Sequence, residues 1–182
     1  NAALREASLT DPLTGLHNRR YLALAMPEEE IRLRRVFRNH LDRGESPLGR
    51  NEDLVLFMLD LDHFKRVNDT HGHAAGDEVL RQTAQVLRSV TRSSDTLVRW
   101  GGEEFLLVAK RMDRERANLI AENLCRAIRD HVYALPDGRT LRCTVSVGFA
   151  ACPILERAPE AFGWEDTLQA ADQCLYAVKR AG

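Results

Sequence analysis

The sequence predicts an α/β (α+β) fold in which a mainly antiparallel central sheet is flanked by helices. Strand-like and helix-like segments are mixed along the chain without a strict βαβ alternation, and one β-hairpin is clear at residues 97–109. Residues 54–62 form an almost continuous apolar run, which is typical of a central strand buried on both faces. With 182 residues, 44% of them hydrophobic, the chain has enough apolar material for one domain with a sizeable core.

The chain is expected to begin in a helix and then pass through a turn-rich segment. Residues 1–8 resemble the end of a helix that enters from upstream. Asp11-Pro12 and Gly15 then break regular structure, and a helix is expected to begin near Asn18. Because the chain starts with Asn-Ala-Ala and not with methionine, we expect it to be a fragment of a longer protein.

Pro27 and the three glutamates after it predict the start of a second helix. Proline is tolerated at the first helical position, and acids are favoured at the positive end of the helix dipole. This helix should continue through an arginine-rich segment, in which we expect Ile31, Val36 and Phe37 to point inward and the arginines outward. The arginines could also bind phosphate or a membrane surface, but a solvated helix face is the favoured interpretation.

The remaining elements follow from their hydrophobic periodicity. In chain order they are a loop at 43–53, the strand at 54–62, an amphipathic helix at 74–91, hairpin strands at 97–100 and 103–109, a helix at 113–131, a long alternating strand at 139–152 and a last helix at 165–180.

The stretch RWGGEEFLLVA, residues 99–109, places two carboxylates after a hairpin turn and before an apolar strand. Gly101 and Gly102 are expected to supply the positive φ angles of a two-residue turn. Neighbouring side chains on a strand point to opposite faces, and both faces here are apolar. At least one of Glu103 and Glu104 should therefore lie at the lip of a buried surface. The alternative is a solvated hairpin end.

A third acid lies where it could meet this hairpin. Asp60 is at the end of the buried strand, and if the hairpin pairs beside that strand, Asp60 and Glu103 meet at the same edge of the sheet. Converging carboxylates repel each other unless a cation lies between them. Mg2+ characteristically takes one or two carboxylates together with water and phosphate oxygens. On this interpretation Glu103 is a metal ligand, and the glycines let phosphates approach the backbone closely.

The segment after the buried strand is dense in groups that suit a nucleotide. Lys65 can meet phosphate charge, and the amides of His63 and Phe64 can approach the phosphates. Asn68 and Asp77 could read the edge of a base. The alternative for this segment is a capped surface loop that leads into a helix.

Composition and spacing argue against other classes of protein. The net charge of -1 disfavours a sequence-independent nucleic-acid binder, so an anionic ligand must be held by local groups or by metal. No apolar run approaches transmembrane length and no secretory leader is present, so we expect no membrane contact by this domain. Four widely spaced cysteines suit reduced thiols, and His71-Gly72-His73 has no further Cys/His cluster nearby to complete a zinc site.

Five motifs occur in order along nearly the whole chain: DPLTGLHNRR, DLDHFKRVNDTHGHAAGD, RWGGEEF, SVGFA and ADQCLYAVK. Together they resemble the GGDEF family of diguanylate cyclases, here in a GGEEF variant. The resemblance implies that residues 9–182 join two GTP molecules into the second messenger cyclic di-GMP and release two pyrophosphates, in the bacterial cytoplasm. It implies a fold similar to the palm of nucleotide cyclases and polymerases. It also implies an upstream sensory domain, joined through a linker helix that ends at residues 1–8, in a parent protein that is either free or membrane-tethered.

Carried over by position, the resemblance assigns roles to individual residues. The metal ligands are Asp60, the Leu61 carbonyl and Glu103, for two Mg2+ ions, or Mn2+ in their place, in each half-site. Glu103 and Glu104 are the implied catalytic acids, and Glu104 either ligates metal or helps to deprotonate the attacking 3′-hydroxyl. The residues implied to bind GTP are His63, Phe64, Lys65, Asn68, His73, Asp77, Gly101, Gly102 and Lys179. Since each domain holds one GTP, catalysis needs an antiparallel homodimer.

Five residues separate the stretch RSSD, with Arg92 and Asp95, from Gly101. This spacing matches the product-inhibition site of the family, whose arginine engages the guanine and phosphates of cyclic di-GMP. An arginine fork can hydrogen-bond guanine O6 and N7 together. The alternative is an ordinary surface charge pair, which contributes little to stability.

Two features depart from the family pattern. The stretch between Arg20 and Asp60 is longer than expected, which predicts an added or extended helical segment at about 27–50. The chain also ends at Gly182, where the family often continues into another basic phosphate contact. The alternative function is a receptor that binds cyclic di-GMP and catalyses nothing, although such domains usually lose acids that this sequence keeps. A bare dimerisation module would not explain the groups suited to a nucleotide.

Overall fold

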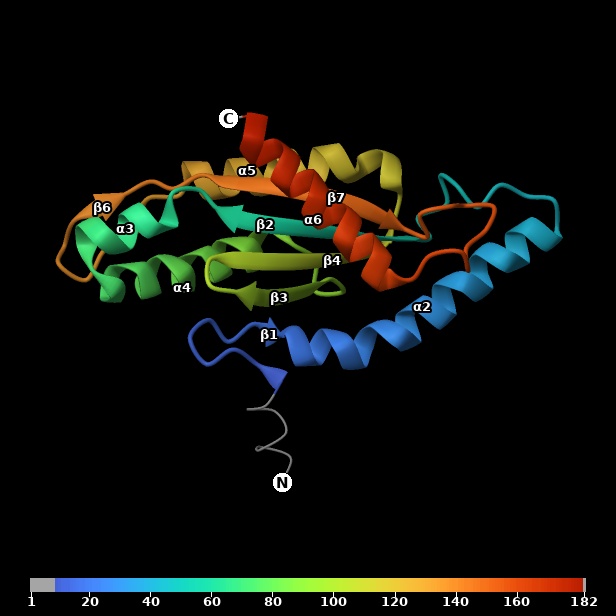
Figure 1. The fold of residues 1–182 in the computed structure, drawn as a ribbon, viewed down its shortest axis with the longest axis horizontal. Coiled ribbons are helices and arrows are strands. Elements are labelled where there is room, and N and C mark those ends of the chain that lie inside the picture. The colour runs from blue at the N-terminus through green and yellow to red at the C-terminus, as the bar shows by residue number, and fades with distance from the viewer. Residues whose placement is uncertain (1–8, 182) are drawn as a thin grey trace, which may run out of the picture.

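A five-stranded sheet with strand order β1-β3-β4-β2-β7 forms the centre of the protein (Figure 1). The structure is a computed structural model that describes residues 9–181, so the predicted helix end at residues 1–8 lies outside the described part. The strands are β1 (His17–Asn18), β2 (Asp53–Leu61), β3 (Thr96–Gly101), β4 (Glu104–Met112) and β7 (Val145–Cys152). Only β1 and β3 pair in parallel, which confirms the predicted mainly antiparallel sheet.

Helices cover both faces of the sheet and enclose two hydrophobic cores. The helices are α2 (Arg19–Asp42), α3 (Phe64–His71), α4 (His73–Val90), α5 (Ala117–Asp130) and α6 (Trp164–Ala181), with a 3-10 turn η1 (Arg114–Arg116) before α5. One core lies between the sheet and α4 with α5, and the other lies between the sheet and α2 with α6. Figure 1 shows α6 crossing the sheet over β7. The predicted helices at 74–91, 113–131 and 165–180 are confirmed within a few residues.

The strand β2 is the centre of the core, as predicted. Residues 53–59 are all buried, because β4 and β7 flank the strand and helices cover both of its faces. Alternate side chains enter opposite cores: Val55, Phe57 and Leu59 enter one, while Leu54 and Leu56 enter the other. The sheet therefore carries Asp60 to the rim of a fully packed strand.

The hairpin turn is one residue later than predicted. Gly101 pairs with Glu104, so the two turn residues are Gly102 and Glu103 and not Gly101 and Gly102. The cause is a register shift after Arg99, which is typical of a β-bulge. Only Gly102 has a positive φ, of 44°. The hairpin does pair beside β2, with Asp60 opposite Glu104.

The predicted new helix at Pro27 is wrong. Pro27 lies inside α2, which runs without interruption from Arg19 and buries Leu33 and Phe37 completely. This burial offsets the hydrogen bond that proline cannot donate. Ile31, expected to point inward, is 68% exposed. Nine residues of helix rotate it by about 180° from the buried Leu22.

Two other segments differ from the expected elements. Residues 64–71, for which no helix was predicted and a surface loop was the alternative, form the short helix α3. The predicted strand at 139–152 is broken: β6 (Thr140–Leu141) pairs with β5 (Tyr133–Ala134) in a separate two-stranded sheet, and β7 starts at Val145. The alternation of residues continues through the break, but β2 ends opposite Val145 and no longer offers a partner.

Candidate active site

The end of β2 and the turn of the β3–β4 hairpin meet at one edge of the sheet. Asp60 pairs with Glu104 across the two strands, and the Leu61 amide donates a hydrogen bond to the Glu103 carbonyl at 3.3 Å. The predicted convergence of Asp60, Leu61 and Glu103 is therefore present in the backbone. Antiparallel pairing brings the end of one strand against the start of its partner strand.

Negative charge accumulates at this edge. Burial raises the pKa of the Glu104 carboxyl above its ordinary value, and the charge of Asp60 raises this pKa further. Asp172 of α6 and Glu103 act in the same direction, while the guanidinium of Arg19 opposes them. Asp172 was not among the predicted site residues. The charge of Asp172 acts on Glu104 because α6 packs onto the sheet.

Asp60 has an oxygen that suits a cation. The Asp60 side chain is 13% exposed, and its buried Oδ1 atom accepts no hydrogen bond from any residue that the structure describes. Lys179 Nζ lies 2.5 Å from this atom, which is ion-pair distance without hydrogen-bond geometry. Within residues 9–181 no group of three or more His, Cys, Asp or Glu side chains is arranged to hold a metal ion. The carboxylate and carbonyl oxygens of Asp60, Leu61 and Glu103 nevertheless fit the ligand preference of Mg2+, which usually takes few protein ligands.

The loop after β2 is held in place by Asp62, for which the sequence indicated no role. Asp62 accepts hydrogen bonds from Thr144 Oγ1 at 2.6 Å and from Ser146 Oγ at 2.7 Å, and its amide donates to the Thr144 carbonyl at 2.9 Å. These bonds fasten the loop to the start of β7. The loop therefore presents a defined backbone to any ligand at the end of β2.

The N-terminus of α3 is open to an anion. His63 precedes the helix in the left-handed region, with φ 56°, and no side chain of the described residues caps the helix there. The first amides of a helix lack backbone partners and attract negative groups. The predicted phosphate contacts at His63 and Phe64 therefore lie at an uncapped helix start. Lys65, in its first turn, is exposed.

The predicted base-binding residues lie where α3 meets α4. A Cβ added to Gly76 would come within 1.9 Å of Asn68 Oδ1, so the amide of Asn68 lies directly against α4. Asp77 is the next residue on α4 and is exposed, as is His73 at the start of that helix. The structure thus brings Asn68 and the Asp77 region together across the two helices.

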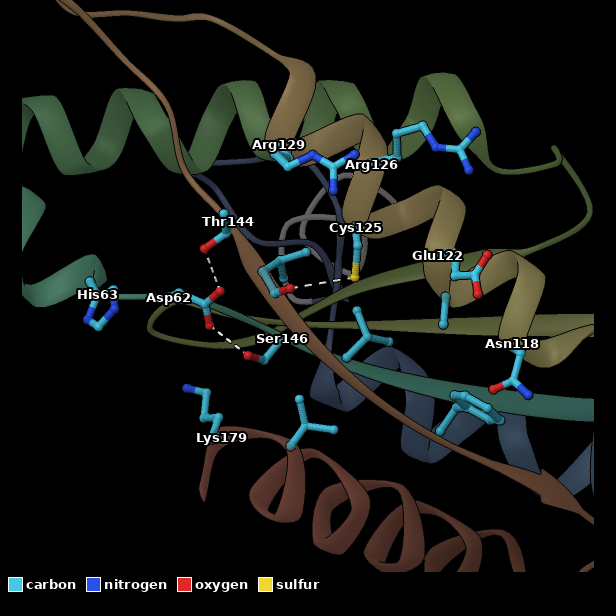
Figure 2. A pocket seen from close by; sticks show the side chains of 15 residues that line it. Asp62, His63, Asn118, Glu122, Cys125, Arg126, Arg129, Thr144, Ser146 and Lys179 are labelled. Carbon is cyan, nitrogen blue, oxygen red and sulfur yellow. Dashed lines mark hydrogen bonds between the residues drawn. The ribbon is translucent and has the colours of Figure 1, made fainter. Parts of the chain in front are cut away.

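A groove of about 1020 Å³ runs along β7 between α5 and α6 (Figure 2). Asp62, His63 and Lys179 line it together with residues of α5 such as Glu122 and Arg129. Figure 2 shows Lys179 reaching from α6 toward the loop at Asp62. Lys179 therefore stands between this groove and the Asp60 carboxylate.

Arg92 and Asp95 lie at the other end of β3 from the hairpin turn. Asp95 accepts hydrogen bonds from the backbone amides of Arg92 at 3.1 Å and Lys110 at 3.3 Å. In the described part of the chain the Arg92 guanidinium forms no ion pair with Asp95. Both residues line two small cavities, of about 380 and 310 Å³, and the smaller one also carries Arg116 and the apolar side chain of Ile120.

The family model described as "Diguanylate cyclase, GGDEF domain" matches residues 8–182. The chain belongs to the GGDEF family. The observed sheet, with the GGEEF hairpin beside the Asp60 strand, is consistent with this family, and solved structures of GGDEF domains share its fold.

This GGDEF domain is 39% identical over 178 residues to diguanylate cyclase DgcP of Pseudomonas aeruginosa, covering 98% of the chain and 23% of that protein. It is 37% identical over 153 residues to the cyclic di-GMP phosphodiesterase NbdA of the same organism, covering 84% of the chain and 18% of that protein. The coiled coil and GGDEF domain of DgcB from Caulobacter crescentus, solved with c-di-GMP, matches with a TM-score of 0.75 and 28% identity, over 100% of this chain and 85% of that one. The GGDEF domain thus spans less than a quarter of the length of these two curated relatives.

Two further observations bear on the GGDEF domain as a whole. Among the described residues, no helix has the length and apolar character needed to cross a membrane. All four cysteines are free thiols, as their spacing predicted.

Proposed function

We propose that this GGDEF domain condenses two GTP molecules into cyclic di-GMP with release of two pyrophosphates. The observation that carries the proposal is the meeting of Asp60, Glu103 and Glu104 at one sheet edge, with a buried Asp60 oxygen that lacks a hydrogen bond. Such an arrangement is electrostatically costly without positive charge, which the Lys179 ammonium supplies to Asp60 here, and it suits the metal-assisted chemistry of phosphates. The family membership supports the same reaction.

In this proposal Asp60, the Leu61 carbonyl and Glu103 hold the metal, two Mg2+ ions or two Mn2+ ions in each half-site. When bound, the metal neutralises the charge that develops on the α-phosphate during in-line attack. Glu104 either completes the metal ligands or accepts the proton of the attacking 3′-hydroxyl. Its half-buried position next to Asp60 supports a role inside the site and not at a solvated hairpin end.

The phosphates of GTP are assigned to the uncapped start of α3 and to two lysines. The amides of His63 and Phe64 and the ammonium of Lys65 receive the phosphates, while Lys179 exchanges Asp60 for a phosphate oxygen when GTP binds. Gly102 lets the phosphates approach the turn, since no described atom lies within 4 Å of a Cβ built there.

The guanine is assigned to the junction of α3 and α4. Asn68 and Asp77 read its edge, and His73 contacts the base or the ribose. The packing of the Asn68 amide against Gly76 supports this assignment, because it holds one hydrogen-bonding group still beside Asp77. Since the half-site holds one GTP, two domains must face each other for the 3′-hydroxyl of one nucleotide to reach the α-phosphorus of the other.

Product inhibition is assigned to the cavities beside Arg92 and Asp95. The Asp95 carboxylate is occupied by backbone amides, so the Arg92 guanidinium is left to bind a ligand, with Arg116 across the 310 Å³ cavity. A guanidinium pair above an apolar wall suits a guanine base that carries phosphates. The complex of DgcB with c-di-GMP supports binding of the product by a GGDEF domain.

A receptor without activity is the second candidate, favoured by the likeness to a protein named as a phosphodiesterase. In either case we propose a bacterial cytoplasmic domain controlled by an upstream sensory domain through a linker that includes residues 1–8. The small share of the relatives that the chain spans supports this organisation.

The test is to incubate the domain with GTP and Mg2+ and to measure cyclic di-GMP and pyrophosphate by chromatography. Glu103→Gln is the control, because it keeps the size of the side chain but removes the charge of a metal ligand. We expect a loss of roughly 100-fold or more in rate, with an unchanged circular dichroism spectrum. Binding of cyclic di-GMP without any synthesis by the unmutated domain would establish the receptor instead.

A further inference from the structure

The two glycines of the GGEEF motif meet different structural demands. Gly102 has a φ of 44°, and no described atom lies within 4 Å of a Cβ built on it, so its requirement is conformational. Gly101 has no positive φ. A Cβ on Gly101 would lie 2.9 Å from Arg19 Nη2, 3.7 Å from Arg19 Cζ and 3.8 Å from Glu104 Oε2. A side chain at Gly101 would therefore displace the Arg19 guanidinium from its observed position.

Arg19 is bound to the hairpin by three contacts of one planar group. Its Cζ atom lies 4.4 Å from the ring centroid of Trp100, which is cation–π distance. Its Nε atom donates a hydrogen bond to the Trp100 carbonyl, and its Nη2 atom lies 3.7 Å from Glu104 Oε2. The side chain of Arg19 is 56% exposed, so the ion pair alone stabilises the fold little. These contacts join Arg19, the first residue of α2, to the turn of the β3–β4 hairpin.

A second arginine holds the other side of the same turn. Arg99 donates to the Gly102 carbonyl at 3.0 and 3.3 Å and to the Asp11 carboxylate at 3.1 and 3.2 Å. The turn is thus held from the DPLTGLHNRR segment at two points, by Asp11 through Arg99 and by Arg19 directly. Without Arg19, the side of the turn that carries Glu104 keeps its backbone pairing with Gly101 and Asp60 and the Leu61–Glu103 hydrogen bond, but it loses the side-chain contact of Arg19 with the Glu104 carboxylate.

We propose that Arg19 is a positioning residue for Glu104. We further propose that Gly101, which has no side chain, leaves the space that the Arg19 guanidinium occupies. The proposal rests on the proposed function only for its effect on catalysis. Arg19 sets the direction of the Glu104 carboxylate relative to Asp60 and neutralises part of the negative charge there. The close approach of phosphates assigned to the glycines then belongs to Gly102 alone.

The experiment is a double-mutant cycle of Arg19→Ala and Gly101→Ala, with urea unfolding and turnover of GTP as readouts. Gly101→Ala alone should lower the urea midpoint only slightly, because the exposed end of Arg19 can move aside. It should reduce kcat by about tenfold or more with little change in KM, because a displaced catalytic group costs rate before it costs binding. In the Arg19→Ala background the same glycine change should have little further effect. Arg19→Lys should not restore kcat, since an ammonium lacks the planar fork.

Two controls make the cycle specific. Gly102→Ala should be equally harmful with and without Arg19, because its requirement is the positive φ. Arg35→Ala, at an exposed position on the same helix, should change neither readout. Additive effects of Arg19→Ala and Gly101→Ala on the urea midpoint would contradict the proposal that Gly101 leaves space for Arg19. Coupled stability with an unchanged kcat in Arg19→Ala would overturn the positioning role. The urea readout applies even if the domain makes no cyclic di-GMP, so failure of the proposed function is seen separately.

Discussion

At the scale of single residues, Asp60 and Lys179 form the contact that relates most directly to the proposed metal site. Lys179 Nζ lies 2.5 Å from Asp60 Oδ1, and the lysine side chain is 38% exposed, so it can leave toward solvent or toward a phosphate. A positive charge at this distance competes with any cation for the same oxygen. The charge of Lys179 should therefore weaken metal binding when no nucleotide is present.

We predict that Lys179→Met tightens Mn2+ binding to the nucleotide-free domain by about fivefold, since two unit charges a few ångströms apart in water interact by about 1 kcal/mol. The same change should weaken binding of GTP. Both affinities can be measured by calorimetry. Arg180→Met is the control, because it removes a positive charge from the same turn of α6, where Arg180 stacks on Tyr176. Equal or weaker Mn2+ binding by Lys179→Met would contradict the competition.

A second prediction at this scale concerns Asp77. If Asp77 accepts hydrogen bonds from the N1 and N2 donors of guanine, the domain should discriminate strongly against ATP, because adenine lacks this pair of donors. Asp77→Ser should reduce the GTP preference, measured as the ratio of the kcat/KM values for the two nucleotides. Asp69→Ser, an exposed acid on α3, should leave the ratio unchanged. Equal use of ATP and GTP by the unmutated domain would remove guanine recognition from Asp77.

At the scale of elements, α2 shows how tertiary contacts carry a helix through an unfavourable residue. Glu29, two residues after Pro27, accepts from Lys110 of β4 at 2.8 Å and from Arg32 at 3.1 Å. Burial raises the pKa of Glu29, but these two partners outweigh burial and hold that pKa below its ordinary value. The helix is thus fastened to the sheet close to the position where it lacks a hydrogen bond. The cost of Pro27 remains in the folded protein.

Pro27→Ala should therefore stabilise the domain, by about 1–3 kcal/mol in free energy of unfolding, because alanine restores the missing donor and removes the clash with the preceding turn. Urea unfolding followed by circular dichroism measures the change. Activity should be unaffected, since the side chain of Pro27 is exposed. A lower urea midpoint would mean that the sheet contacts of α2 require the shape that proline imposes.

At the scale of the whole molecule, the sheet separates the two proposed ligand sites. β3 runs from Thr96 to Gly101, with Arg92 and Asp95 before its start and the hairpin turn after its end. A strand of this length spans roughly 17–20 Å. Product bound at Arg92 is therefore too far from Asp60 to occupy the GTP site. In the proposed mechanism it therefore acts on how two domains are arranged.

We expect Arg92→Ala to abolish inhibition by added cyclic di-GMP while initial rates with GTP stay nearly unchanged. Calorimetry should show the loss of most of the product affinity, because contacts to guanine and to phosphate disappear together. If the variant were inhibited at the same product concentration as the unmutated domain, Arg92 would be an ordinary surface residue.

The proposed need for two half-sites predicts how specific activity depends on protein concentration. Specific activity of the isolated domain should rise with protein concentration, because each site is completed by a second copy. Analytical ultracentrifugation on the same samples reports the population of dimers. Constant specific activity from a protein that stays monomeric would rule out the two-domain mechanism.

The local pattern of residues was enough to predict much of the fold. The apolar run of β2, the hairpin, and the helices α4, α5 and α6 follow from hydrophobic periodicity and turn residues, which act over a few neighbouring positions. The residues at which helices and strands begin and end were harder to predict. The turn shifted by one residue because of a bulge, and the strand predicted at 139–152 broke where β2 ended as its partner.

The sequence by itself determined the family, the sheet and the meeting of Asp60 with the hairpin acids, because ordered motifs and alternation are properties of the chain. The tertiary structure decided the contacts around them. Arg19 reaches Trp100 across 81 positions, and Asp62 reaches Ser146 across 84. Such pairs leave no periodic trace in the sequence, since Arg19 and Asp62 taken alone resemble ordinary surface charges. They become specific only when packing of the two cores brings distant segments to the same edge of the sheet.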